Sequence, residues 1–86
     1  MRLDLFLKLS RLVKRRTVAH EMCEAGRVHV NGHETKPSKE LKQGDRIALL
    51  FTTKVVELKV LALPDRKSMQ KANVTDLYRI IIEKNE

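Results

Sequence analysis

The chain has 86 residues, a length typical of one small domain whose thin core leaves no room for a large catalytic chamber. Its 18 Lys and Arg residues outnumber 11 Asp and Glu, and the resulting net charge of +7 favours a polyanionic partner. A single cysteine allows no internal disulfide, which favours a reducing compartment. The longest apolar run, Ile47 to Phe51, is far shorter than the ~20 residues of a membrane span, and no signal peptide is recognisable. We therefore expect a soluble, cytoplasmic, basic domain with no membrane partner.

The positive charge is concentrated near the N-terminus. Residues 1–16 hold six basic and one acidic residue, a net charge of +5, whereas residues 17–46 are neutral overall and residues 47–86 carry +2. The six basic residues are Arg2, Lys8, Arg11, Lys14, Arg15 and Arg16. Because this cluster is local and barely neutralised, it favours nucleic acid over a merely solvated face. The segment also lacks the tryptophan and the two-faced pattern of a membrane-surface helix.

Two helices are predicted at the start of the chain. The apolar residues from Leu3 to Val13 cover a broad arc when plotted at about 100° per residue, which indicates the first helix. Asp4 and Lys8 have the i,i+4 spacing of an ion pair that supports such a helix.

The second helix is expected between Thr17, whose hydroxyl caps the first turn, and Gly26, which suits the left-handed conformation at a helix end. The basic run at residues 14–16 then lies just before a helix N-terminus, whose free N–H groups favour a phosphate.

Strands are predicted after Gly26, where the periodicity changes from helical to alternating. Residues 27–30 alternate polar and apolar side chains, and the following Asn31-Gly32 pair is typical of a tight hairpin. A turn at Gly44 and Asp45 leads into a strand over residues 46–51, and a second strand is expected over residues 54–61. Residues 65–73 are polar and are expected to form a loop.

The tail from Val74 onward has a mixed pattern. Leu77, Tyr78 and Ile81 continue a helical spacing, whereas the run Ile80–Ile82 is β-branched and typical of a strand. We expect a helix here. The sequence as a whole indicates an α+β fold, with one domain at residues 1–62 and a C-terminal loop and tail at residues 63–86.

No catalytic or metal-binding pattern is recognisable in the sequence. Four possible zinc ligands would have to converge without a CxxC pair to anchor them, so we expect a buried cysteine and exposed histidines instead. The candidates are Cys23, His20, His29 and His33. No serine lies in a nucleophile-elbow motif, and the three glycines are too scattered for a phosphate-binding loop. We expect neither enzymatic activity nor a cofactor.

The aromatic content argues against recognition by base stacking. Phe6, Phe51 and Tyr78 lie in three separate apolar segments and are expected in the core. Single-strand binders place several aromatic side chains on an exposed sheet. Recognition is therefore expected to depend on phosphates and on RNA shape.

Taken in order, these features resemble the RNA-binding domain named after ribosomal protein S four, the αL-motif domain. The resemblance covers residues 2–51 and depends on the Arg16-Thr17 helix start, the segment Gly26–Gly32, Lys36-Pro37-Ser38, and the stretch from Leu41 to Ile47. It implies two N-terminal helices packed on a small, mostly antiparallel sheet.

The start of the chain is similar to one group of such proteins, that of heat-shock protein fifteen and RqcP. The similarity lies in Arg2-Leu3-Asp4 and in the run from Ser10 to Thr17, and the chain lacks the longer basic extension of the heat-shock branch. It implies a bacterial, monomeric ribosome-associated quality control factor. Such a factor binds ribosomal RNA of the obstructed large subunit and stabilises P-site peptidyl-tRNA, while a partner tailing factor extends the stalled nascent chain.

Carried over to this sequence, the resemblance implies an RNA-binding surface with Arg16 as its leading member. Asp4 is expected to orient a neighbouring guanidinium or to form an ordinary surface pair. The implied RNA-binding residues are Arg2, Lys8, Arg11, Lys14, Arg15, Arg16, Thr17 and Lys36.

Three other functions remain open from the sequence. The chain is also compatible with a general rRNA- or tRNA-binding or subunit-assembly protein, and with an accessory module that acts in trans with an RNA-modifying enzyme. A small basic DNA-binding protein is the third alternative.

Overall fold

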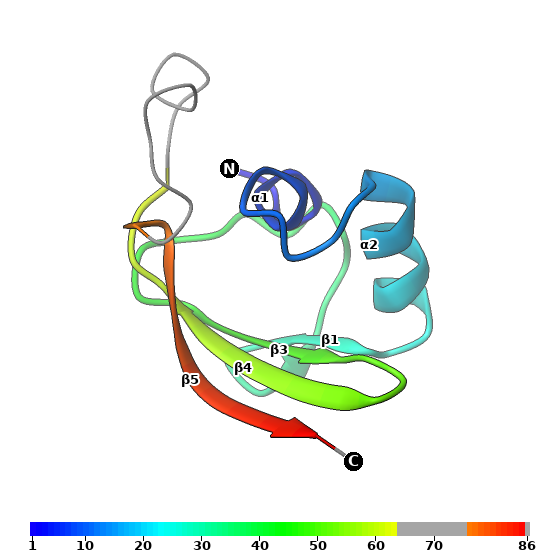
Figure 1. Ribbon diagram of the computed structural model, residues 1–86. Helices are drawn as coiled ribbons and strands as arrows, with labels where there is room; N and C mark the ends of the chain where they lie inside the picture. Colours follow the sequence, from blue (N-terminus) through cyan, green and yellow to red (C-terminus); the bar gives the residue numbers. More distant parts are fainter. Residues whose placement is uncertain (64–75, 86) are drawn as a thin grey trace.

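The computed structural model describes residues 1–63 and 76–85 (Figure 1). The elements in chain order are α1 (Leu3–Leu9), α2 (Arg16–Glu24), β1 (Val28–Val30), β2 (His33–Glu34), β3 (Arg46–Leu50), β4 (Lys54–Val60) and β5 (Tyr78–Asn85). Both helices lie on one side of a single antiparallel sheet with strand order β2-β1-β3-β4-β5. The predicted α+β fold is confirmed. No helix within the described ranges is long and apolar enough to cross a membrane.

The core lies between the helices and the sheet. Alternate residues of β3 and β4, such as Ile47 and Leu58, are completely buried, and their neighbours along each strand face the opposite side. Phe6 of α1 is fully buried against this layer, which confirms its predicted place in the core, whereas Phe51 and Tyr78 are only half-buried and pack at the margin of the core. The elements that the structure describes thus cover the sheet on one face only, as antiparallel sheets allow.

The start of α1 is capped by a distant loop. Arg2 occupies the N-cap position and makes no side-chain capping hydrogen bond. Instead, the N–H groups of Leu3 and Asp4 donate to the carbonyl oxygens of Lys39 (2.8 Å) and Pro37 (3.0 Å). Since the first N–H groups of a helix have no partner within it, the loop supplies the missing acceptors. This contact holds the loop containing Lys36 beside the first turn of α1.

The end of α1 contains a strained residue. The buried hydroxyl of Ser10 donates to the carbonyl oxygen of Phe6 at 2.7 Å, and Arg11 follows with a φ of 62°. Non-glycine residues seldom adopt this left-handed conformation, which ends helices more often with glycine. The helix therefore stops well before Val13, which is buried in the connection to α2.

The expected cap of α2 at Thr17 is wrong. The helix already begins at Arg16, and the last extended residue is Arg15, which makes no side-chain capping hydrogen bond. Thr17 therefore lies within the first turn and not before it. At the other end Gly26 has a φ of 71°, which confirms its predicted role in ending the helix.

The hairpin between β1 and β2 is confirmed. Asn31 and Gly32 have φ values of 53° and 84°, the left-handed pair of a type I′ turn. Asn31 also bonds through its backbone and side chain to Arg46, which fixes the hairpin against the start of β3.

The expected C-terminal helix is wrong for the part of the tail that the structure describes. Residues Tyr78–Asn85 form β5, which pairs antiparallel with β4, with one register shift between Glu57 and Leu58 that leaves Ile81 without a partner on β4. The β-branched isoleucines favour a strand, and pairing with β4 adds this strand to the edge of the sheet. Val74 and the predicted loop over residues 65–73 lie outside the described residues.

The left-handed Arg11 predicts that a glycine there stabilises the fold. Arg11→Gly should relieve about 1–2 kcal/mol of strain at a cost of about 0.5–1 kcal/mol in chain entropy, for a gain of up to about 1.5 kcal/mol. The free energy of unfolding in urea measures this gain. Lys14→Gly, at a residue with negative φ, is the control and should only lose stability. Equal losses in both variants would contradict the strain.

Candidate nucleic-acid interface

A single buried carboxylate gathers three basic side chains between the two helices. Asp4 is completely buried, and its Oδ2 accepts hydrogen bonds from Nη2 of Arg2 (3.1 Å), Nη2 of Arg16 (3.1 Å) and Nε2 of His20 (2.7 Å). Its Oδ1 accepts from the backbone N–H of Leu5 at 2.7 Å. We call Asp4, Arg2, Arg16 and His20 the Asp4 cluster. It joins residues up to 16 positions apart in the sequence.

The two helices place these side chains by their spacing. Asp4 stands in the first turn of α1, where a negative charge suits the helix dipole, and Arg2 precedes the same turn. Arg16 is the first residue of α2, and His20 follows one turn later on the same face. The N-terminal ends of α1 and α2 therefore meet at one carboxylate.

The electrostatics of the cluster leave it net positive and open to solvent. The side chains of Arg2, Arg16 and His20 are 47%, 44% and 43% exposed, although the carboxylate they share is buried. Each guanidinium has five N–H donors and commits one nitrogen to Asp4, so further donors are free to meet an oxyanion. The arrangement is suited to holding phosphate oxygens.

The charge of Asp4 is maintained by its partners. Burial raises the pKa of this carboxyl group, but the hydrogen bonds from His20, Arg16 and the Leu5 N–H together outweigh it, so the pKa of Asp4 lies below its usual value. An ionised carboxylate only accepts hydrogen bonds, and therefore Nε2 of His20 must carry the proton in this contact.

The cluster contains two of the eight predicted RNA-binding residues, Arg2 and Arg16. Lys36 lies exposed in the loop whose Pro37 carbonyl caps α1, and so belongs to the same end of the molecule. The other five are exposed on α1, α2 or the connection between them, outside the Asp4 cluster. They are Lys8, Arg11, Lys14, Arg15 and Thr17.

Two expectations about this region need correction. Asp4 does not form the predicted helix pair with Lys8, because Arg2, Arg16 and His20 occupy its oxygen; within the described residues Lys8 is in no ion pair. The expectation that Asp4 orients a guanidinium is confirmed, since it holds two. The sequence predicts His20 only as a metal ligand or an exposed side chain, whereas the structure places it on Asp4. Its i,i+4 spacing from Arg16 was the signal for a place in the cluster.

The other metal-ligand candidates are one buried core residue and two residues on neighbouring strands. Cys23 is buried in the core, where burial and the charge of Asp4 raise the pKa of its thiol to about 11. Nε2 of His29 lies 3.1 Å from the carbonyl oxygen of Gly26, and His33 is exposed on β2. Among the residues the structure describes, no three His, Cys, Asp or Glu side chains are grouped to hold a metal ion.

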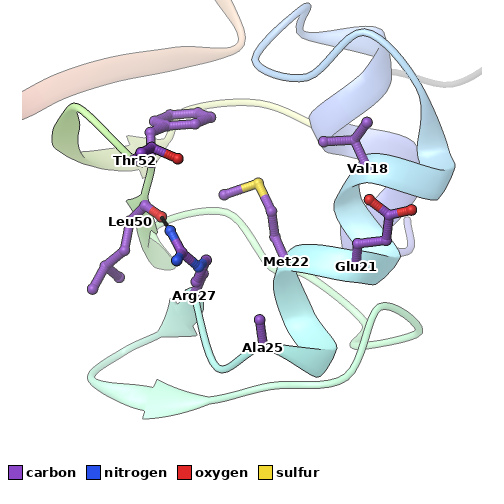
Figure 2. Close-up of a pocket in the computed structure, with 8 residues that line it drawn as sticks. Val18, Glu21, Met22, Ala25, Arg27, Leu50 and Thr52 are labelled. Atoms are coloured by element: carbon purple, nitrogen blue, oxygen red, sulfur yellow. Dashed lines mark hydrogen bonds between the residues drawn. The ribbon is translucent and has the colours of Figure 1, made fainter.

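A separate apolar groove lies on another face of α2 (Figure 2). Its volume is about 350 Å³, and Val18 and Met22 form one wall while Leu50 and Thr52 form the other. Arg27 stands on the β3 side and donates to the Leu50 carbonyl oxygen at 3.4 Å. The groove has far less positive charge than the Asp4 cluster, which is the better candidate for nucleic acid.

Comparison with known proteins identifies the family of the chain. Residues 1–47 match the model of the S4 domain family. The chain is 46% identical to the RQC P-site tRNA stabilizing factor of Listeria monocytogenes over 83 residues, 96% of this chain and 88% of that protein. Among solved structures, it is similar to heat shock protein 15 of Vibrio cholerae, a trimeric structure, with a TM-score of 0.78 and 32% identity over 94% of this chain and 81% of that one. The solution structure of the hypothetical protein HP1423 gives a TM-score of 0.79 at 36% identity, over 98% of this chain and 100% of that one.

The lowered pKa of Asp4 predicts an acid-dependent loss of stability. A free aspartate titrates near about pH 4, so the contribution of Asp4 is complete above that pH and is lost as the pH falls toward its lower folded-state pKa. At neutral pH Asp4→Asn should reduce the free energy of unfolding by about 1–3 kcal/mol. Urea unfolding of both proteins from neutral to acidic pH measures the difference, which should shrink below about pH 4. A difference that stays constant with pH would contradict the ion pairs.

Proposed function

This chain belongs to the S4 domain family, in the group of P-site tRNA stabilizing factors and heat shock protein 15, and from this premise we propose that it is a ribosome-associated quality control factor. It binds RNA of the obstructed large ribosomal subunit together with the peptidyl-tRNA in the P site. It acts by holding the tRNA in place and not by catalysis.

The Asp4 cluster is the observation that supports this proposal most directly. The two guanidinium groups share one carboxylate oxygen, so their directions are fixed before RNA arrives. Binding then loses less side-chain entropy than it would with freely rotating arginines. Arg2, Arg16 and the exposed basic residues around them contact phosphates, and these contacts position the protein on folded RNA.

The surroundings of the cluster complete the proposed RNA surface. Lys8, Arg11, Lys14 and Arg15 extend it along α1 and the connection to α2, and the loop at Lys36 extends it beyond the start of α1. All of these side chains are exposed. With about five phosphate contacts, log affinity should fall against log salt with a slope near −3.5 to −4.5.

In the cell, the proposed factor works as a monomer in the cytoplasm of a bacterium. It occupies the large subunit at the same time as a tailing factor, which extends the stalled nascent chain while the tRNA is held. A general rRNA-binding or assembly protein would use the same cluster without preferring stalled subunits. Sedimentation separates the two functions: the quality control role requires co-migration with large subunits that carry peptidyl-tRNA, in preference to intact ribosomes.

Removal of one cluster arginine should weaken RNA binding. Arg16→Ala removes an oriented phosphate contact and should reduce affinity for large subunits carrying peptidyl-tRNA about 10-fold, with a salt slope shallower by about 0.7–0.9. Affinity is measured by filter binding at several salt concentrations.

The matched control for this variant is Arg27→Ala. It removes the same side chain and the same charge beyond the C-terminal end of α2, beside the apolar groove. It should change affinity less than about 2-fold. Equal affinities for Arg16→Ala and the unmodified protein would exclude the Asp4 cluster from RNA binding.

Asp4→Asn separates orientation of the arginines from overall charge. The change raises the net charge from +7 to +8, so charge alone predicts tighter RNA binding. If Asp4 instead positions Arg2 and Arg16, affinity should fall, by about 3-fold to 10-fold. Filter binding at neutral pH measures the change, and circular dichroism verifies that the variant is folded. Tighter binding by the folded variant would contradict the positioning role.

A further inference from the structure

Three basic residues form a straight row across the sheet. Arg46 of β3 pairs directly with Lys59 of β4, and Lys59 pairs with Arg79 of β5. All three side chains are exposed. Adjacent strands are about 4.8 Å apart, so the row places three positive charges within about 10 Å. We call Arg46, Lys59 and Arg79 the sheet row.

The sheet row faces away from both helices. Ile47 and Leu58, which are the strand neighbours of Arg46 and Lys59, are completely buried on the side that α1 and α2 cover. Successive side chains of a strand point to opposite faces, so the row lies on the other face. Figure 1 shows no described element covering that face. The sheet row and the Asp4 cluster are therefore on opposite sides of the sheet.

The row carries unneutralised charge. Like charges directly opposite each other on neighbouring strands destabilise a sheet, and these lie well within a Debye length. None of the three forms an ion pair with the residues that the structure describes. The nearby Asp45 carboxylate is engaged by the Asn31 side chain (3.1 Å) and by the backbone N–H of Lys42 (2.9 Å). Because repulsion among these three cations lowers the stability of the free protein, an anionic ligand that neutralises them would relieve it.

The chemistry around the row favours a phosphodiester backbone. The adjoining hollow of about 470 Å³ contains no large apolar side chain of the kind that anchors a protein partner. Its lining residues are His29, Asn31, Gly32, Arg46, Ala48 and Glu57. Among the described strand residues this face carries no Phe, Tyr or Trp side chain, and its one aromatic ring is that of His29, which argues against a stacking platform there. The next set of paired residues on this face is Ala48, Glu57 and Ile82, so one carboxylate stands beside three cations and the row keeps the net positive charge that binding to a nucleic-acid backbone requires.

We propose that the sheet row is a second phosphodiester-binding site, so that this chain holds two RNA segments on opposite sides of its sheet. The inference rests on the proposed RNA-binding function and adds a second surface to it. The Asp4 cluster binds one segment, and Arg46, Lys59 and Arg79 bind the backbone of another. The protein thereby acts as a spacer between two pieces of RNA.

The test variant is Lys59→Gln/Arg79→Gln, and its matched control is Lys54→Gln/Lys84→Gln. Both remove two positive charges from β4 and β5, but the control residues lie at the opposite end of these strands from the row. The probe is a short RNA duplex of about one helical turn, counted on the protein by native mass spectrometry. The unmodified protein and the control should take up two duplexes, and the test variant one.

Two further readouts distinguish a binding site from general charge. The test variant should have a salt slope for large-subunit binding that is shallower by about 1.4–1.8, which corresponds to two lost phosphate contacts. Its unfolding midpoint should rise, because like charges have been removed from neighbouring strands. The control should show no rise in the unfolding midpoint, because Lys54 is paired with Glu83 at 3.5 Å and is not opposed by a like charge, and its salt slope should change less than that of the test variant.

The proposal is overturned if the unmodified protein takes up only one duplex, or if test and control variants lose affinity equally. It is also overturned if polyglutamate competes for the row and RNA does not, which would indicate an acidic protein partner. Arg16→Ala keeps the two proposals distinct. If that variant loses RNA affinity and the test variant does not, the sheet row fails while the proposed function stands; if neither loses affinity, the proposed function fails as well.

Discussion

The buried carboxylate of Asp4 is the constraint on which the RNA surface depends. An ionised group without contact to water is stable only when it is paired, and Asp4 obtains its partners from both helices. The same hydrogen bonds therefore fix α1 against α2 and direct the arginines. Because one negative charge meets two guanidinium groups, the cluster still attracts phosphate.

The sheet gives the molecule two faces with different tasks. Its buried face, with Ile47 and Leu58 among the apolar residues, supports the helices and thus the Asp4 cluster. Its open face carries the sheet row without apolar cover. A small chain with a thin core cannot enclose a ligand, but it can present a surface in two directions. Its basic residues are divided between the helix side, which carries the Asp4 cluster, and the open face of the sheet, which carries the sheet row.

Much of the fold and part of the site follow from the sequence because their signals are local. Residues within a few positions determine the Asn31-Gly32 turn and the end of α2 at Gly26. The orienting role of Asp4 follows from its charge, which is opposite to that of the arginines. The strand at Ile80–Ile82, where a helix was expected, depends on pairing with a distant β4. The place of His20 depends in the same way on how α1 packs against α2. Such contacts between distant segments have no periodic signature in one sequence.

The loop that caps α1 determines when the RNA surface can form during synthesis. Leu3 and Asp4 receive their acceptors from residues 37 and 39, and the N–H of Leu41 returns a hydrogen bond to the carbonyl oxygen of Met1. The N-terminal arginines leave the ribosomal tunnel first, yet the first turn of α1 is completed only after about 40 residues have followed. A nascent or truncated chain thus carries the basic residues without their arrangement, so specific RNA binding is delayed until the domain is whole.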